Sequence, residues 1–288
     1  MQEWQDLFTT SQDGLRLYAR RYGSCIAPKT PVICLPGLTR TTADFHEAAV
    51  AISSAGERAV YAFDYRGRGR SDFDPDWRNY DVKIELSDVL DQMTALQIPE
   101  AIFFGTSRGG MITMLVPILR PAAIKGAILN DVGPVLDGKG LARIRNYVGK
   151  IPQPGTFAEG AAIIKRISST QFPNLDDAGW ERQARRSWVE KDGKLVPAYD
   201  TRIMKTLELI DLEQPLPTLW PQFEALSHIP VLVLRGAHSD ILSPQTAVEM
   251  TKRHPRCALY TVDYEGHAPL LADAPTLDRV TEFVAAIA

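Results

Sequence analysis

The stretch Phe103-Phe104-Gly105-Thr106-Ser107-Arg108-Gly109-Gly110 decides the fold of this chain. The apolar residues 101–104 predict a short buried strand, and the apolar run 111–116 predicts a buried helix directly after the stretch. Glycines stand two residues before and two residues after Ser107, where a tight strand-to-helix turn leaves no room for side chains. The first N–H groups of such a helix point at whatever the serine attacks. The pattern is therefore typical of a nucleophile elbow.

Strand-like and helix-like segments alternate on both sides of this turn. The strand-like segments are a hairpin over 3–22 and the apolar runs 32–35, 59–63, 101–104, 124–129, 231–234 and 259–262. The helix-like segments are 42–54, 82–97, the run after Ser107, 243–254 and 276–287. This alternation predicts an α/β fold with a mostly parallel, doubly wound sheet of about eight strands.

Residues 134–227 interrupt the alternation. They contain helix-like segments separated by proline-containing breaks, and no convincing strand: 141–149, 157–168, 178–190, 199–209 and 219–226. A helical block inserted into an α/β domain is a natural lid over a site at the strand ends. We therefore expect a core made of residues 1–133 and 228–288, with a helical cap over residues 134–227. Trp180 and Trp188 in this cap are candidate pocket residues, although tryptophans there more often serve packing.

The composition is that of an ordinary globular protein. The chain has 288 residues, of which 45% are hydrophobic and 23% are charged, and its formal net charge is −3 at pH 7. A weakly negative charge does not indicate nucleic acid or an anionic membrane as a partner. No apolar run approaches the length of a membrane span. We therefore expect a small-molecule substrate, with neither nucleic acid nor membrane as a partner.

Motifs for metal and cofactor binding are missing from the sequence. The cysteines Cys25, Cys34 and Cys257 are too few and too widely spaced for a disulfide framework or a zinc site. The glycines of the segment 67–69 lack the third glycine and the acidic residue of a dinucleotide site. Residues 1–6 show neither the basic nor the apolar part of a secretory leader. We therefore expect a cytoplasmic protein that uses no metal and no cofactor.

Three residues with complementary chemistry each follow a predicted parallel strand: Ser107, Asp240 and His267. The carboxyl ends of such strands form the crevice in which α/β sheets bind ligands. A serine hydroxyl must lose its proton as it attacks, and an imidazole can take that proton and return it to the leaving group. A buried carboxylate can fix the tautomer of the imidazole. Asp131 also follows a strand and is the alternative acid.

The other histidines have less favourable positions. Only His267 follows the last predicted strand in a tight glycine turn. His254 stands at a helix end, as a C-terminal cap would, and His228 lies in a linker. His46, early in a helix, and His238, close to the candidate acid, are candidates for lining the substrate pocket.

Five motifs carry a resemblance to a known family: Leu35-Pro36-Gly37-Leu38, Asp64-x-Arg66-Gly67-x-Gly69-x-Ser71, Gly105-Thr106-Ser107-Arg108-Gly109-Gly110, Arg235-Gly236-x-x-Ser239-Asp240 and Gly266-His267-Ala268-Pro269. With these motifs the chain resembles α/β-hydrolase-fold enzymes of the esterase, lactonase and C–C hydrolase type over nearly its whole length. The resemblance implies that residues 134–227 are the variable cap of that family. The Ser-Asp-His order favours Asp240 over Asp131 as the acid.

The resemblance also implies how the site works. The backbone N–H groups of Leu38 and Arg108 would form an oxyanion hole. Many relatives carry His-Gly where this chain has Pro36-Gly37, so the side-chain contribution of that histidine is missing here. The implied activity is a serine hydrolase that cleaves a small ester or lactone through an acyl-enzyme. Hydrolysis of a carbon–carbon bond in a diketone, and ligand reception on a hydrolase scaffold, are the alternatives.

The serine at the elbow argues against one branch of the family that the chain resembles. Epoxide hydrolases and haloalkane dehalogenases use an aspartate at the elbow to form an alkyl-ester intermediate. Ser107 stands at that position in this chain, which argues against both activities.

Overall fold

The computed structural model describes residues 3–288. Met1 and Gln2 belong to the N-terminal stretch in which we found no leader pattern, and they lie outside the described residues.

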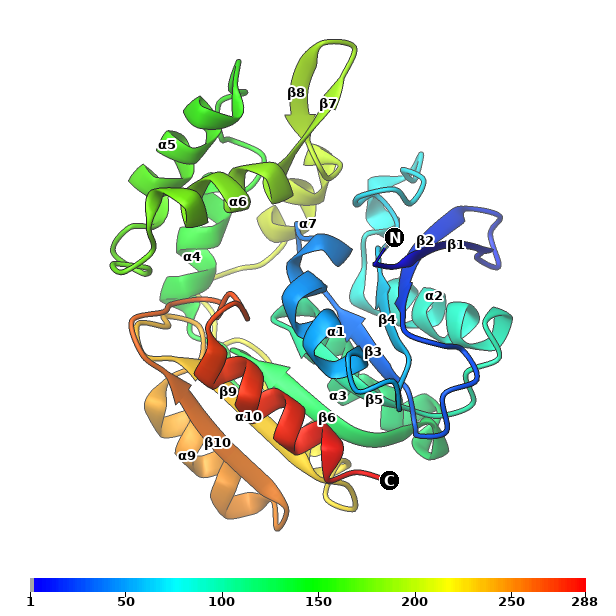
Figure 1. Ribbon diagram of the computed structural model, residues 1–288. Helices are drawn as coiled ribbons and strands as arrows, with labels where there is room; N and C mark the ends of the chain where they lie inside the picture. The colour runs from blue at the N-terminus through cyan, green and yellow to red at the C-terminus, as the bar shows by residue number, and fades with distance from the viewer. Residues whose placement is uncertain (1–2) are drawn as a thin grey trace.

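An eight-stranded, mostly parallel sheet forms the centre of the molecule, as the alternating pattern predicts (Figure 1). Its strands lie in the spatial order β1-β2-β4-β3-β5-β6-β9-β10. Strand β2 is antiparallel to both β1 and β4, and the other neighbours are parallel. The bounds are β1 (Gln5–Thr10), β2 (Arg16–Tyr22), β3 (Val32–Leu35), β4 (Val60–Phe63), β5 (Ala101–Thr106), β6 (Ile124–Asn130), β9 (Val231–Gly236) and β10 (Cys257–Val262).

Helices cover both faces of the sheet, because its central strands are apolar on both sides. Successive side chains of a strand point to opposite faces. In β5, Phe103 therefore packs in the core of one face and Phe104 in the core of the other. The helices on the Phe104 face are α1 (His46–Ser53) and α10 (Ala274–Ala285), and those on the Phe103 face are α2 (Val82–Ala95), α3 (Arg108–Leu119) and α9 (Pro244–Arg253). The predicted doubly wound α/β fold is thus confirmed.

Between β6 and β9 the chain leaves the sheet and forms a separate group of elements beyond the carboxyl ends of the strands (Figure 1). These elements are α4 (Gly138–Tyr147), α5 (Phe157–Ser168), α6 (Asp177–Ser187), β7 (Trp188–Lys191), β8 (Lys194–Pro197) and α7 (Met204–Glu208). At the base of this group the N–H of Leu219 donates to the carbonyl of Pro134 at 2.7 Å. The following helix, α8 (Trp220–Glu224), packs against α3, and its Phe223 belongs to the core of the Phe103 face.

The expectation that residues 134–227 contain no strand is wrong. Helix α6 ends at Ser187 rather than at residue 190, and the chain continues as the antiparallel hairpin β7–β8. Asp192 and Gly193 connect the two strands with φ of 53° and 71°. This left-handed conformation is what a two-residue hairpin turn needs, and Asp-Gly is its common sequence signal.

Candidate active site

Ser107 occupies a strained turn between β5 and α3. Its φ of 50° and ψ of −110° lie in a region that side-chain-bearing residues rarely adopt. A Cβ on Gly109 would lie 1.9 Å from the carbonyl oxygen of Leu35, and a Cβ on Gly105 would lie 2.3 Å from the backbone of Gly109. Only glycines at these two positions let the turn close, so the glycine spacing around Ser107 has the steric cause that the sequence indicates.

His267 links Ser107 to Asp131. Its Nε2 lies 2.9 Å from Ser107 Oγ, and its Nδ1 lies 2.7 Å from Asp131 Oδ2. The side chain of Asp131 is fully buried and that of His267 is nearly so. The structure thus brings Ser107 and His267 together as expected, but the carboxylate against His267 belongs to Asp131. The expected contact of Asp240 with His267 is wrong.

Local hydrogen bonds explain why Asp131 takes this place. The residue follows directly on β6 and has a left-handed φ of 55°. The backbone N–H of Gly236, at the end of neighbouring β9, donates to its Oδ1 at 2.9 Å. The hydroxyl of Ser239 donates to its Oδ2, the same oxygen that faces His267. These donors hold the carboxylate in one orientation toward the imidazole.

Asp240 has a different partner. It lies farther out in the loop after β9, where it accepts two hydrogen bonds from Arg143 of α4, at 2.6 and 2.9 Å. Burial raises the pKa of Asp240, but the hydrogen bonds and charge of Arg143, a hydrogen bond from Gln171 and the nearby His267 together lower it, and the net shift is downward. The sequence could not show this partner, because Arg143 lies about a hundred residues earlier and in the insertion. The position of Asp131 directly at a strand end is the signal that could have favoured it.

Two backbone N–H groups lie close to Ser107. Leu38, in the loop after β3, lines the same cavity as Ser107, and Arg108 is the first residue of α3. The first N–H groups of a helix have no partner inside the helix. Within residues 3–288, neither the N–H of Leu38 nor that of Arg108 donates to a backbone carbonyl. Both N–H groups are therefore without a backbone acceptor in this part of the chain.

Polar contacts hold the loop that carries His267. The N–H of His267 donates to Gln171 Oε1 at 3.0 Å, and Asn130 Nδ2 donates to the carbonyl of Pro269 at 3.0 Å. Glu265 Oε2 accepts the N–H of Leu270 at 2.7 Å. Burial raises the pKa of Glu265 to about 7. The imidazole is thus fixed by the sheet, by its own loop and by one residue of the insertion.

A cavity of about 170 Å³ lies between the Ser107–His267 pair and the insertion. Its lining includes apolar side chains, such as Ile144 and Phe172, together with Trp180, which was expected in the pocket. Trp188 instead lines an adjoining cavity of about 110 Å³.

Two arginines in the cavity wall connect the insertion to the core. Arg40 makes a bidentate ion pair with Asp44, at 2.6 and 2.7 Å, and also donates to Gln183 of α6 at 2.8 Å. Arg186 of α6 pairs with Glu47 of α1 at 2.6 Å. Sequence analysis missed these residues, because no local pattern shows which side chains of an insertion will face the core.

Two candidate pocket histidines lie elsewhere. His46 contacts the hydroxyl of Tyr22 at 3.2 Å and the carboxylate of Glu3 at 3.1 Å, and it does not line the cavity. His238 is exposed and does not line the cavity either. Neither histidine takes the expected place, because His46 is held by Tyr22 and Glu3 and His238 lies at the surface.

Residues 3–288 contain neither a metal-binding cluster nor a membrane-spanning helix. Across this range, no three or more His, Cys, Asp or Glu side chains gather where they could ligate a metal ion. None of the helices described there combines the length and the apolar character that crossing a membrane requires.

Comparison with known proteins identifies the family. A family model described as "Alpha/beta hydrolase family" matches residues 32–283. The chain is 31% identical over 283 residues to a 3-hydroxybutyrate-oligomer hydrolase of Cupriavidus necator, a match that covers 93% of this chain and 92% of the relative. It is 26% identical over 264 residues to the sn-1-specific diacylglycerol lipase ABHD11 of Mus musculus, covering 88% and 80%. The crystal structure of an alpha/beta hydrolase from Novosphingobium aromaticivorans superposes with a TM-score of 0.92, at 38% identity and 99% coverage of both chains. The chain therefore belongs to the alpha/beta hydrolase family, and it is a hydrolase.

Proposed function

We propose that this hydrolase cleaves carboxylic esters, with Ser107 as nucleophile, His267 as proton carrier and Asp131 as the acid that orients His267. The observation that carries the proposal is the hydrogen-bonded series Ser107–His267–Asp131 beside the cavity. The relatives support it, because 3-hydroxybutyrate oligomers and diacylglycerols are both esters.

The contacts define the steps of the reaction. His267 Nε2, 2.9 Å from Ser107 Oγ, takes the hydroxyl proton as the oxygen attacks the ester carbonyl. The carbonyl oxygen gains negative charge, which the N–H groups of Leu38 and Arg108 stabilise; one such donor is typically worth ~2.7–4 kcal/mol. The tetrahedral intermediate expels the alcohol, which receives its proton from His267. Water then attacks the acyl-enzyme by the same steps and releases the acid and free Ser107.

Asp131 sets the tautomer of His267. Its ionised carboxylate can only accept, so Nδ1 of His267 must carry a proton and Nε2 is left free to accept from Ser107. The negative charge also stabilises the imidazolium that forms when the serine proton is transferred.

We further propose that the substrate is a short aliphatic ester, such as a 3-hydroxybutyrate oligomer, and that the insertion acts as a cap that selects it. The cavity of about 170 Å³ beside Ser107 has room for a short acyl group. Phe172 and Trp180 from the insertion form part of its wall, so the cap shapes the space that the acyl group enters. The 31% identity to the oligomer hydrolase over most of both chains supports the same substrate class.

A substrate panel tests the proposal. Wild-type protein and Ser107→Ala are assayed with p-nitrophenyl esters of increasing acyl length, 3-hydroxybutyrate dimers and trimers, lactones, and ring-cleavage diketones. We expect turnover of the short esters by the wild type and its loss in Ser107→Ala. Retained ester hydrolysis in Ser107→Ala would exclude Ser107 as the nucleophile. Turnover of the diketones alone would favour carbon–carbon hydrolysis by the same residues.

A further inference from the structure

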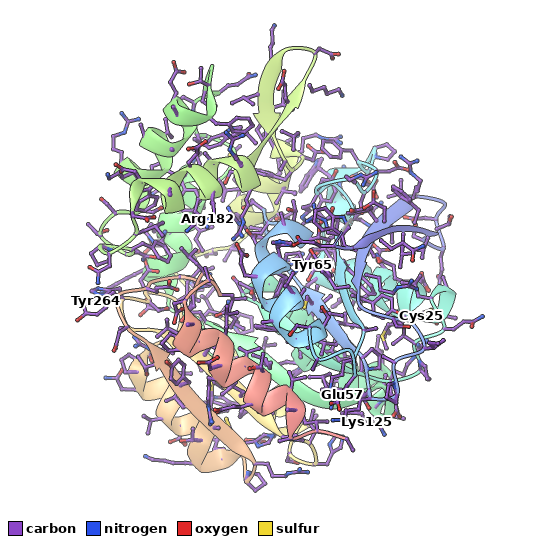
Figure 2. All side chains as sticks on the ribbon, in the orientation of Figure 1. Cys25, Glu57, Tyr65, Lys125, Arg182 and Tyr264 are labelled. Carbon is purple, nitrogen blue, oxygen red and sulfur yellow. The ribbon has the colours of Figure 1, made fainter. Side chains whose placement is uncertain are left out.

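A buried ionic series lies behind the two proposed oxyanion donors. Glu85 of α2 is fully buried and stands between two arginines, with Oε1 2.6 Å from Arg68 Nη1 and Oε2 2.7 Å from Arg108 Nε. Arg68 is itself fully buried, and its guanidinium lies 5.5 Å from the ring centres of both Tyr65, labelled in Figure 2, and Tyr80. One carboxylate thus holds two cations in the interior.

Each of the two arginines reaches one of the proposed donors. Arg68 Nε donates to the backbone carbonyl of Leu38 at 2.8 Å. Arg108 supplies its own backbone N–H to the site, and its Nη2 donates to the carbonyl of Tyr80 at 2.9 Å. Glu85 therefore connects the loop that carries Leu38 with the first residue of α3. No other residue of the described chain 3–288 forms ion pairs with both arginines.

From these contacts, and resting on the proposed serine mechanism, we infer that Glu85 is the positioning residue of the oxyanion hole. Oxyanion donors act only if they are already in place when charge develops on the substrate oxygen. The loop around Leu38 has no strand partners to fix it. The hydrogen bond from Arg68 fixes the peptide unit that follows Leu38, and this unit is directly connected to the one that carries the Leu38 N–H. Arg108 is held from its side-chain end in the same way. Glu85 sets the distance between the two donors by binding both arginines at once.

The cost of burying these charges favours a positioning role for Glu85 over a purely stabilising one. Glu85 and Arg68 are fully buried and Arg108 is largely so, and the desolvation of these charges is a cost that their attraction only partly offsets. Apolar side chains of similar volume would often give a fold at least as stable. Burial works against ionisation of Glu85, but the charges of Arg108 and Arg68 outweigh it and lower its pKa, so the carboxylate stays ionised at neutral pH. The ionic series therefore contributes little net free energy to folding, and it lies where the two proposed oxyanion donors must be held rigid.

The same helix offers a matched control. Asp88 of α2, one turn after Glu85, is also a buried carboxylate and makes a bidentate pair with buried Arg66 at 2.6 and 2.7 Å. It contacts neither Arg68 nor Arg108. Glu85→Gln and Asp88→Asn each turn a buried, arginine-paired carboxylate into an amide. Only Glu85 contacts the two arginines that reach the proposed oxyanion donors.

The test separates ground-state binding from stabilisation of the oxyanion. Wild type, Glu85→Gln and Asp88→Asn are assayed for kcat and KM with p-nitrophenyl acetate, for thermal unfolding, and for affinity toward a trifluoromethyl ketone, which forms a tetrahedral adduct with a reactive serine. Loss of one full donor costs roughly 10²–10³-fold in kcat. We expect a displaced pair of donors in Glu85→Gln to lower kcat by about 10–100-fold, with KM changed by less than about threefold. The affinity for the ketone should fall by the same factor, and Asp88→Asn should change neither quantity by more than about threefold.

Each outcome decides the question. Unchanged kcat and ketone affinity in Glu85→Gln, or equal losses in Asp88→Asn, would overturn the inference while leaving the proposed function intact. If Glu85→Gln does not fold, Arg68→Lys takes its place, because lysine keeps the charge next to Glu85 but lacks the Nε donor to Leu38; full kcat in that variant overturns the inference as well. If Ser107→Ala still hydrolyses esters and the wild type does not bind the ketone, the proposed function and this inference are both overturned.

Discussion

Replacing Asp131 by asparagine is the change that most directly tests the proposed acid. Three donors converge on its carboxylate: the N–H of Gly236 on Oδ1, and the hydroxyl of Ser239 and Nδ1 of His267 on Oδ2. An asparagine side chain has one acceptor oxygen and one NH₂ group. Whichever way the amide turns, its NH₂ group faces at least one of these donors.

The two orientations have different consequences. With the amide oxygen toward Gly236, the NH₂ group donates to His267 Nδ1, and the imidazole proton moves to Nε2, which can then no longer accept from Ser107. With the oxygen toward His267, the NH₂ group opposes the N–H of Gly236 and leaves a buried donor unsatisfied, at a cost of ~1–3 kcal/mol. In neither orientation does a negative charge remain beside the imidazolium. A wrong tautomer lowers kcat by about 10⁴-fold in serine triads, which corresponds to roughly 5 kcal/mol.

Asp240→Asn is the matched control for this prediction. The pair with Arg143 is partly open to solvent, with side chains 30% and 27% exposed, and pairs of this kind contribute ~0–1 kcal/mol. We therefore expect kcat/KM for p-nitrophenyl acetate to fall by about 10⁴-fold in Asp131→Asn and by less than about fivefold in Asp240→Asn, both measured at pH 8 on folded protein. The reverse ranking of the two variants would refute the assignment of Asp131.

Three further changes have expected outcomes. Ser107→Ala should lower kcat by roughly 10⁶-fold and should abolish labelling by a fluorophosphonate; labelling that persists places the nucleophile elsewhere. Gly109→Ala should destabilise the fold by on the order of 3 kcal/mol in urea unfolding, because its Cβ would meet the Leu35 carbonyl oxygen at 1.9 Å, whereas Gly138→Ala, with open space around the new Cβ, should change little. Glu265, with its pKa raised from 4.5 to about 7, favours the native state while it is neutral, so this contribution is present below about pH 4.5 and is lost as the pH rises through 7. Between pH 4.5 and 8, the free energy of unfolding of the wild type should therefore fall by up to roughly 3 kcal/mol more than that of Glu265→Gln. Equal decreases in the two proteins would contradict this account.

Local patterns were sufficient for the strands of the main sheet and for two of the three residues in the hydrogen-bonded series. The strands β5 and β9 are continuous apolar runs, and Ser107 stands between glycines whose spacing has one steric explanation. His267 follows the last strand in a glycine turn. Each of these features is contained in fewer than ten consecutive residues, so the sequence displays it directly.

Features that depend on distant parts of the chain could not be predicted in the same way. Two aspartates follow strand ends, and which of them meets His267 depends on the course of the loop after β9 and on Arg143 of the insertion. The side chains of the cavity wall are set by how α5 and α6 lie over the core, and no periodicity fixes that. The hairpin β7–β8 was a different case, because the Asp-Gly pair at 192–193 is a local signal that could have predicted it.

We propose that Asp131, directly after β6, orients His267, whereas Asp240, in the loop after β9, holds the insertion. Asp131 follows directly on β6, where Gly236 and Ser239 donate to its carboxylate, so the orientation of this carboxylate does not depend on the insertion. Asp240 is released from the imidazole and binds Arg143 of α4 instead. The same helix carries Tyr147, whose ring lies 5.8 Å from the Arg143 guanidinium and whose side chain lines the cavity. We therefore expect a change at Asp131 to lower the rate for every substrate, and a change at Asp240 to act through the cavity wall formed by α4.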